Sequence, residues 1–104
     1  MARERITYLS GPVTNNPGYK RAFARAKEVL MADGCPNVIN PAELDSVMHG
    51  DATYENYMTV CLKLLDVATE IVLLPGWEKS TGCNRELGYA MAKGIDVFIY
   101  KGEE

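Results

Sequence analysis

Residues 73–90 read LLPGWEKSTGCNRELGYA, and the rest of the chain is organised around this stretch. The apolar run 71–74 stops at Pro75 and Gly76, a polar loop follows, and Ser80 or Thr81 is placed to cap a helix. Three residues at helical spacing form the apolar face of that helix: Leu87, Ala90 and Met91. The stretch therefore predicts a strand–loop–helix unit. In open α/β sheets, ligands bind at such a loop, beyond the carboxyl end of the strand.

The start of this helix is suited to an anion. Its first N–H groups have no partner within the helix, and Ser80, Thr81 and Gly82 are small enough to admit a ligand. Glu86 lies about one and a half turns into the helix, where its carboxylate can face the same crevice. Local spacing also fits a plainer interpretation, in which Ser80 and Thr81 only cap the helix and Glu86 is a solvated surface acid.

Composition restricts the class of protein. The 104 residues predict one domain, 1–104, with a single modest core. A net charge of −3 argues against a nucleic-acid polymer as partner, since non-specific binding needs a basic surplus. We find no signal peptide and no apolar run near the roughly 20 residues of a membrane span, so we expect a cytoplasmic protein without membrane association. The cysteines lack metal-ligand spacing, so we expect reduced thiols and no metal site at Cys35, Cys61 and Cys83.

Strand-like and helix-like segments alternate along the chain. Short apolar runs predict four strands, at 6–9, 38–39, 71–74 and 97–100. We expect the three helices between them to begin at Pro17 after an Asn16 cap, near Asp51 or Thr53, and at Thr81. This alternation predicts an α/β, three-layer Rossmann or flavodoxin-like domain. Its four-stranded parallel sheet would have the order 2-1-3-4, with helices on both faces.

The predicted strand order also locates a binding site. Its switch point lies between the first and third strands, so the loops 10–12 and 76–81 should face each other across one crevice. A further segment, 42–52, reads as a loop with room for one helical turn. A loop of that length in so small a domain is often a binding loop or lid.

The residues predicted at the crevice favour glycosyl chemistry. No Gly-x-Gly-x-x-Gly follows the first strand and there is no Walker loop, so we expect no cofactor. A single carboxylate beside an anion site suits attack on a sugar carbon, because such reactions need a group that stabilises or traps an oxocarbenium-like centre. They also need a proton donor for the leaving group unless that group leaves easily. The crevice would offer Tyr8 and Gly11 on one side, and Ser80, Gly82 and Glu86 on the other.

Short motifs spread over nearly the whole chain resemble a known family. They are Tyr8-Leu9-Ser10-Gly11-Pro12, Asn40-Pro41-Ala42, Tyr57-Met58, and Leu74-Pro75-Gly76-Trp77-Glu78-Lys79-Ser80 followed by Gly82, Glu86 and Ala90. On these motifs the chain resembles the nucleoside 2-deoxyribosyltransferase-like family. It is most similar to a small branch of unknown function, the DUF4406 domain, common in phages and prophages. The resemblance implies a nucleoside or nucleotide as small-molecule partner, and assembly into a homodimer or larger homo-oligomer.

The resemblance also implies roles for individual residues. Glu86 matches the family's nucleophile, which forms a covalent glycosyl–enzyme intermediate. Ser80 matches a position that is aspartate in transferases acting on free nucleosides and serine in relatives that hydrolyse nucleoside 5′-monophosphates. A serine hydroxyl at a helix start can donate to a phosphate, whereas a carboxylate would repel it, so a nucleotide is favoured. Trp77 either stacks on the base or packs its loop onto the fold. Substrate contacts are further implied at Tyr8, Gly11, Pro12, Asn40 and Gly82.

Two positions depart from the family pattern. Relatives carry acids where this chain has Cys61 and Thr69, and a thiol with an ordinary pKa of about 8.5 is a poor general acid. The leaving group therefore needs no protein acid, or another residue donates the proton, or the protein binds its ligand without turnover. The proposed donors are Glu55, Glu78 and His49, from this chain or from a neighbouring subunit. The sequence thus predicts cleavage or transfer of an N-glycosidic bond, with a non-catalytic nucleotide-binding or sensing protein as the alternative.

Overall fold

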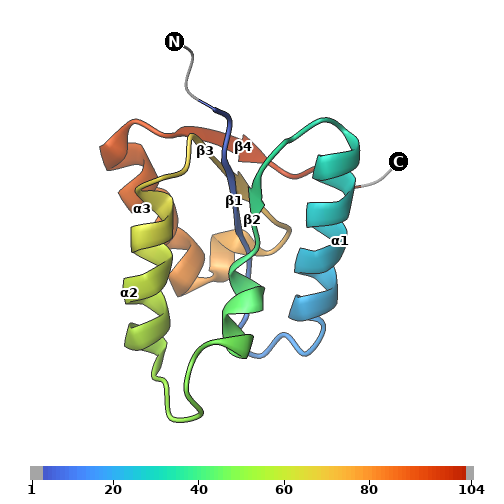
Figure 1. Cartoon of the computed structure of the whole chain (residues 1–104). Helices are drawn as coiled ribbons and strands as arrows, with labels where there is room; N and C mark the ends of the chain where they lie inside the picture. Colours follow the sequence, from blue (N-terminus) through green and yellow to red (C-terminus); the bar gives the residue numbers. More distant parts are fainter. Residues whose placement is uncertain (1–3, 103–104) are drawn as a thin grey trace.

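The computed structural model of the chain describes residues 4–102. Strands and helices alternate throughout this part of the chain, as Figure 1 shows. In chain order the elements are β1 (Thr7–Ser10), α1 (Tyr19–Ala32), β2 (Val38–Ile39), the 3-10 helix η1 (Pro41–Ser46), α2 (Tyr54–Leu65), β3 (Glu70–Leu73), the 3-10 helix η2 (Trp77–Lys79), α3 (Thr81–Lys93) and β4 (Asp96–Ile99).

The four strands form one parallel sheet in the order β2-β1-β3-β4. This confirms the predicted order 2-1-3-4 and the α/β, flavodoxin-like architecture. In the register, Tyr8 of β1 lies opposite Ile39 of β2 and Ile71 of β3. Because β1 and β3 are parallel neighbours, the loops that follow them leave the sheet at the same edge.

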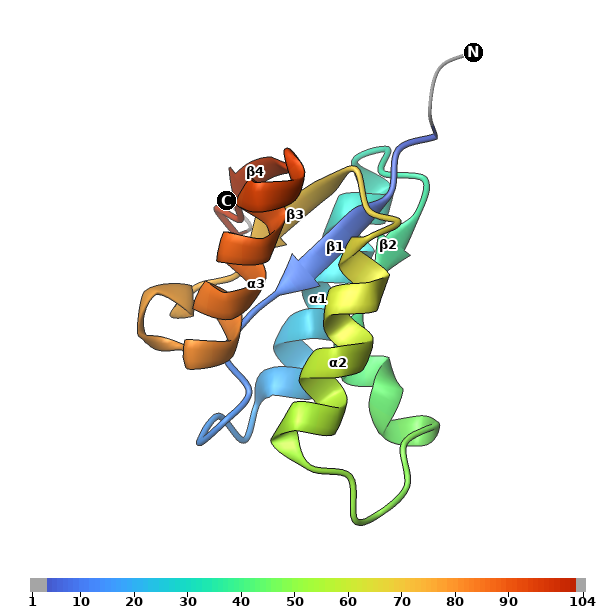
Figure 2. The same cartoon turned by 90° about the vertical axis from the view of Figure 1, so that its left-hand side faces the viewer.

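Helices cover both faces of the sheet (Figure 2). Successive residues of a strand point to opposite faces, so Tyr8 and Leu9 enter different cores. Facing α1 is a core of Leu9, Phe23, Ala26, Val72 and Leu74. Facing α2 and α3 is a second core of Tyr8, Cys61, Leu65, Ala68, Ile71, Leu73 and Ala90.

The helix that follows β3 begins where the sequence predicts. Ser80 is the N-cap of α3, and its Oγ accepts a 3.2 Å hydrogen bond from the amide of Cys83. The helix ends at Gly94 in the left-handed conformation, φ 75°, which a glycine adopts at little cost. Thr53 caps α2 within a capping box that includes Asn56.

Three local predictions were wrong. Helix α1 begins at Tyr19 rather than Pro17, because the Asn16 side chain donates to the carbonyl of Pro12 and holds the preceding loop instead of capping. Met91 is 66% exposed, since the buried stripe of α3 runs through Cys83, Glu86 and Ala90. The first, third and fourth strands also differ from the predicted bounds by one residue.

Within residues 4–102, no helix is both long and apolar enough to span a membrane.

Candidate functional site

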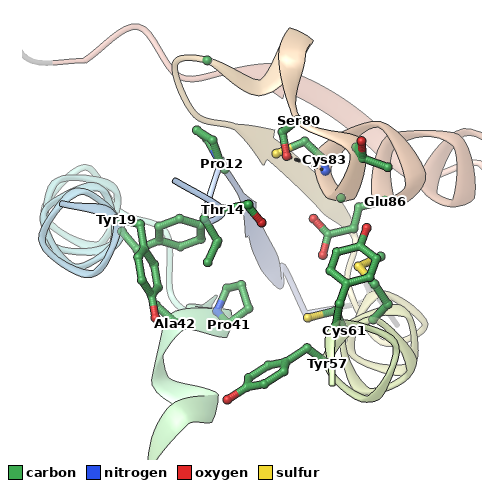
Figure 3. Close-up of a pocket in the computed structure, with 18 of the residues that line it drawn as sticks. Pro12, Thr14, Tyr19, Pro41, Ala42, Tyr57, Cys61, Ser80, Cys83 and Glu86 are labelled. Atoms are coloured by element: carbon green, nitrogen blue, oxygen red, sulfur yellow. Dashed lines mark hydrogen bonds between the residues drawn. The ribbon is translucent and has the colours of Figure 1, made fainter. Parts of the chain in front are cut away.

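A pocket of about 690 Å³ lies beyond the carboxyl ends of β1 and β3. It is walled by the loop after β1, by η1, by one side of α2 and by the start of α3, and Figure 3 shows these walls converging on one space. The predicted crevice between the loops 10–12 and 76–81 is therefore present. Its lining includes Gly11, Pro12, Thr14, Tyr19, Asp45, Tyr57, Cys61, Lys79, Ser80, Gly82, Cys83 and Glu86.

Glu86 supplies a buried carboxylate at one end of this pocket. The residue is only 6% exposed, so the alternative of a solvated surface acid was wrong. The Tyr8 hydroxyl donates to Oε2 at 2.5 Å and the Ser10 hydroxyl donates to Oε1 at 2.6 Å. Burial raises the pKa of Glu86 above its ordinary value of 4.5, although the hydrogen bonds from Ser10 and Tyr8 act in the opposite direction. A carboxylate held at both oxygens has a fixed orientation toward the pocket (Figure 3).

The thiol of Cys61 contacts this carboxylate from α2. Burial raises the pKa of Cys61 to about 11. A thiol with such a pKa donates its proton less readily than an ordinary one, which supports the inference from sequence that Cys61 is a poor general acid. Cys35, Cys61 and Cys83 are all free and buried.

The start of α3 forms another wall of the pocket. Since Ser80 Oγ accepts from the amide of Cys83, its hydrogen remains able to donate to a ligand. The amides of Thr81 and Gly82 belong to the first turn of α3, where no carbonyl within the helix can reach them. Lys79 also lines the pocket and adds positive charge. This wall presents hydrogen-bond donors, which suits an anionic group.

Sequence reasoning missed the far wall of the pocket. There Asp45 of η1 accepts hydrogen bonds of 2.7 Å from the hydroxyls of Tyr19 and Tyr57, and forms a 3.0 Å ion pair with Lys20. These contacts, led by the hydrogen bonds from Tyr19 and Tyr57, lower the pKa of Asp45 to about 2. The sequence analysis identified the loop 42–52 and the Tyr57-Met58 motif separately. No pattern of neighbouring residues indicated that side chains from these two segments would form hydrogen bonds with each other.

Two glycines in the loops of the predicted crevice have a clear structural reason for their type. A Cβ at Gly11 would lie 3.0 Å from both Leu74 and Phe23, so a larger residue would require these core side chains to shift. Gly76 adopts φ 91°, and a Cβ there would lie 3.2 Å from the ring of Pro12. Both loops of the crevice thus approach each other closely, and Gly11 and Pro12 both line the pocket.

Three predicted contact residues do not line the pocket. Tyr8 is fully buried behind Glu86 and reaches the site only through its hydroxyl. The side chain of Asn40 caps η1 by accepting from the amide of Ala42. Trp77 is partly buried and packs against the core beneath α2 and α3, as the packing interpretation predicts.

Residues 5–99 match the family model described as a domain of unknown function, DUF4406. The chain belongs to the DUF4406 family. Comparison with curated proteins and with solved structures gave no match.

Few groups in this DUF4406 domain could supply a proton or hold a metal ion. The pocket lining does not include the three proposed proton donors, Glu55, Glu78 and His49. Glu55 instead forms an ion pair with Arg85 on the surface of the protein. Asp45 does line the pocket, but with a pKa of about 2 it is ionised at neutral pH and cannot serve as the acid. Among residues 4–102, no three histidine, cysteine, aspartate or glutamate side chains are grouped so that they could bind a metal.

Proposed function

We propose that this protein cleaves or transfers the N-glycosidic bond of a nucleoside or nucleoside 5′-monophosphate. The observation that carries the proposal is the buried Glu86 carboxylate, held at both oxygens and facing a pocket. The adjoining wall is the start of α3, whose first N–H groups have no partner within the helix and suit an anion. The pocket's volume of about 690 Å³ is within the range of small-molecule sites. The motif resemblance to nucleoside 2-deoxyribosyltransferases supports the same chemistry.

Glu86 would act as the nucleophile. Its carboxylate attacks the sugar C1′, a carbon–oxygen bond forms, and the carbon–nitrogen bond to the base breaks with the electron pair leaving on the base. Water or an acceptor base then attacks C1′, and the carbon–oxygen bond to Glu86 breaks with its electron pair returning to the carboxylate. The attacking group loses a proton to solvent, and the departed base takes one up. Hydrogen bonds from Tyr8 and Ser10 fix the orientation of the carboxylate before reaction, so little reorganisation is needed.

Ser80 would bind the 5′ end of the ligand. A 5′-phosphate placed at the first turn of α3 would meet the Ser80 hydroxyl, two backbone amides and the charge of Lys79. This favours a nucleoside 5′-monophosphate over a free nucleoside. It also leaves Glu86, six positions further along the same helix, close to the sugar.

The test is incubation of the pure protein with nucleosides and 5′-monophosphates in ribose and 2′-deoxyribose forms, with free base measured by liquid chromatography. We expect release of base from monophosphates, and a fall of at least about 10³-fold in Glu86→Gln, since the covalent step is lost. The variant must keep the wild-type circular dichroism spectrum. Release at the wild-type rate by folded Glu86→Gln would exclude the proposed nucleophile.

Cys61 favours the alternative, a protein that binds a nucleotide derivative without turnover. The residue beside Glu86 is a thiol whose pKa is raised to about 11, where the resembling enzymes carry an acid. The variant Cys61→Asp discriminates between the two functions, because general acid catalysis typically contributes about 10²–10⁴-fold. An increase in base release of that order supports the enzyme. A change in nucleotide affinity with no release of base supports the binding protein.

We also propose that the protein forms a homodimer or larger homo-oligomer. Along α2, Met58 is buried and Tyr57 donates to Asp45, which leaves Tyr54, 45% exposed, as the accessible aromatic side chain of the three. Strand β4 also exposes apolar side chains at a sheet edge: Val97, Phe98 and Ile99. Light scattering at micromolar concentration should give at least twice the mass of the chain, and a monomer would contradict the proposal.

A further inference from the structure

The far wall of the pocket, formed by Asp45, Tyr19 and Tyr57, has an arrangement of hydrogen-bonding groups that the proposed chemistry does not use. Figure 3 shows Tyr19 and Tyr57 on the side of the pocket away from Ser80. A ligand whose anionic end lies at Ser80 would therefore direct its opposite end toward this wall. For a nucleoside 5′-monophosphate, that opposite end is the base.

The two tyrosine hydroxyls have committed their hydrogens. Tyr19 donates to Oδ2 of Asp45 and Tyr57 donates to Oδ1, each at 2.7 Å. A hydroxyl has one hydrogen, so each phenol oxygen can only accept a further bond. Lys20, whose ammonium pairs with Oδ2, is not among the residues that line the pocket.

Asp45 itself retains acceptor capacity. A carboxylate has about four acceptor positions. Among the described contacts, three are filled, by Tyr19, Tyr57 and Lys20, and the remaining one is on Oδ1. The Asp45 side chain is 34% exposed, so a ligand can reach it. With a pKa of about 2, the group is ionised throughout the neutral range.

From this wall of acceptors we infer that Asp45 selects a base bearing an exocyclic amino group, such as cytosine or adenine, over the corresponding oxo base. This inference rests on the proposed nucleotide ligand. An amino group would donate to Oδ1, whereas a carbonyl oxygen at the same place would face an ionised carboxylate and two phenol oxygens that have no hydrogen to offer. A site built to accept from a ligand group discriminates against an analogue that cannot donate at that position, because the site's own polar groups are then left unpaired there.

Two isosteric ligand pairs test the inference. Cytidine and uridine 5′-monophosphates differ by amino against oxo at C4, and adenosine and inosine 5′-monophosphates differ in the same way at C6. In each pair the neighbouring ring nitrogen is an acceptor in the amino base and an N–H donor in the oxo base. Dissociation constants are measured by calorimetry for the wild type, Asp45→Asn and Glu43→Gln. Glu43 is the matched control, since it is the other acid of η1, pairs with Lys27 and does not line the pocket.

We expect the wild type to bind the amino member of at least one pair about 10-fold or more tightly than its oxo partner. In Asp45→Asn the preference should fall below about 3-fold, because the amide offers a donor as well as an acceptor. Glu43→Gln should keep the wild-type preference. If Asp45→Asn does not fold, Asp45→Ser replaces it, and the wild-type preference remains a test in itself. A wild-type preference below 3-fold in both pairs, or one that persists in the folded Asp45 variants, overturns the inference.

The same measurements separate this inference from the proposed function. Amino preference with no release of base from any ligand would refute N-glycosidic cleavage and leave the role of Asp45 standing. Release of base without amino preference would refute only the role of Asp45. Failure of every nucleotide to bind would refute both.

Discussion

The hydroxyl of Tyr8 donates a hydrogen bond of 2.5 Å to Oε2 of Glu86, joining β1 to α3 across 78 positions of sequence. Both groups are buried, and burial raises the pKa of each above its ordinary value. Because the pKa of Tyr8 is raised well above 10, its hydroxyl keeps its proton and remains a donor throughout the neutral range. The carboxylate gains a fixed partner, so Tyr8 positions the proposed nucleophile without itself lining the pocket.

The variant Tyr8→Phe should reduce base release by about 10- to 100-fold, because one preorganised hydrogen bond to the reacting carboxylate is lost. Since that bond lowers the pKa of Glu86, its removal should also move the acid limb of the pH–rate profile to higher pH. Tyr89→Phe is the control, as its hydroxyl bonds Asp66 outside the pocket. An unchanged acid limb in Tyr8→Phe would refute the positioning role.

Replacement of Glu86 by glutamine should alter how stability depends on pH. The pKa of Glu86 in the folded protein is raised above 4.5, so the folded state binds this proton more tightly than the unfolded state. The resulting stabilisation is fully present below about 4.5 and is lost as the pH rises through the folded pKa. Urea denaturation from pH 4 to 8 should therefore show a steeper loss of stability for the wild type than for Glu86→Gln. Parallel curves for the two proteins would contradict the raised pKa.

The serine at the start of α3 allows a test of charge without loss of the helix cap. Aspartate caps helices as well as serine does, so Ser80→Asp should keep the bond from the amide of Cys83 and the stability of the fold. Its carboxylate should repel a phosphate, raising the dissociation constant of nucleoside 5′-monophosphates by about 100-fold. Affinity for free nucleosides should change less than about 3-fold, because these ligands carry no phosphate charge for the carboxylate to repel. Equal losses for both ligand classes would show that Ser80 does not contact the 5′ group.

Replacing glycine by alanine should have opposite effects on the stability of the protein at Gly11 and at Gly88. Gly11→Ala should destabilise the protein by about 1–3 kcal/mol, since the new methyl group meets Leu74 and Phe23 at 3.0 Å. Gly88→Ala should stabilise it by roughly 1 kcal/mol, because Gly88 lies within α3 and a Cβ there meets nothing within 4 Å. Thermal or urea denaturation of both variants provides the check. A tolerated methyl group at Gly11 would mean that this glycine is not required by packing.

Some site features follow from neighbours in the chain, and others do not. The Ser80 cap and the exposed start of α3 were predictable, because capping depends on residues three positions apart. The wrong prediction of a helix cap at Asn16 also concerns neighbouring residues. An asparagine side chain can either cap a helix or stabilise a turn, and here it donates to the carbonyl of Pro12. Trp77 could not be assigned from sequence, since packing and stacking both use an aromatic ring.

The alternation of strands and helices, the order of the strands and the edge at which the pocket lies could all be predicted from the amino-acid sequence. Those features follow from apolar periodicity and from the right-handed crossovers that join parallel strands. Only the tertiary structure brought Tyr8 and Ser10 to Glu86, and Tyr19 and Tyr57 to Asp45. Such partners lie on different elements, and whether their side chains meet depends on strand register and helix packing, which no local pattern encodes.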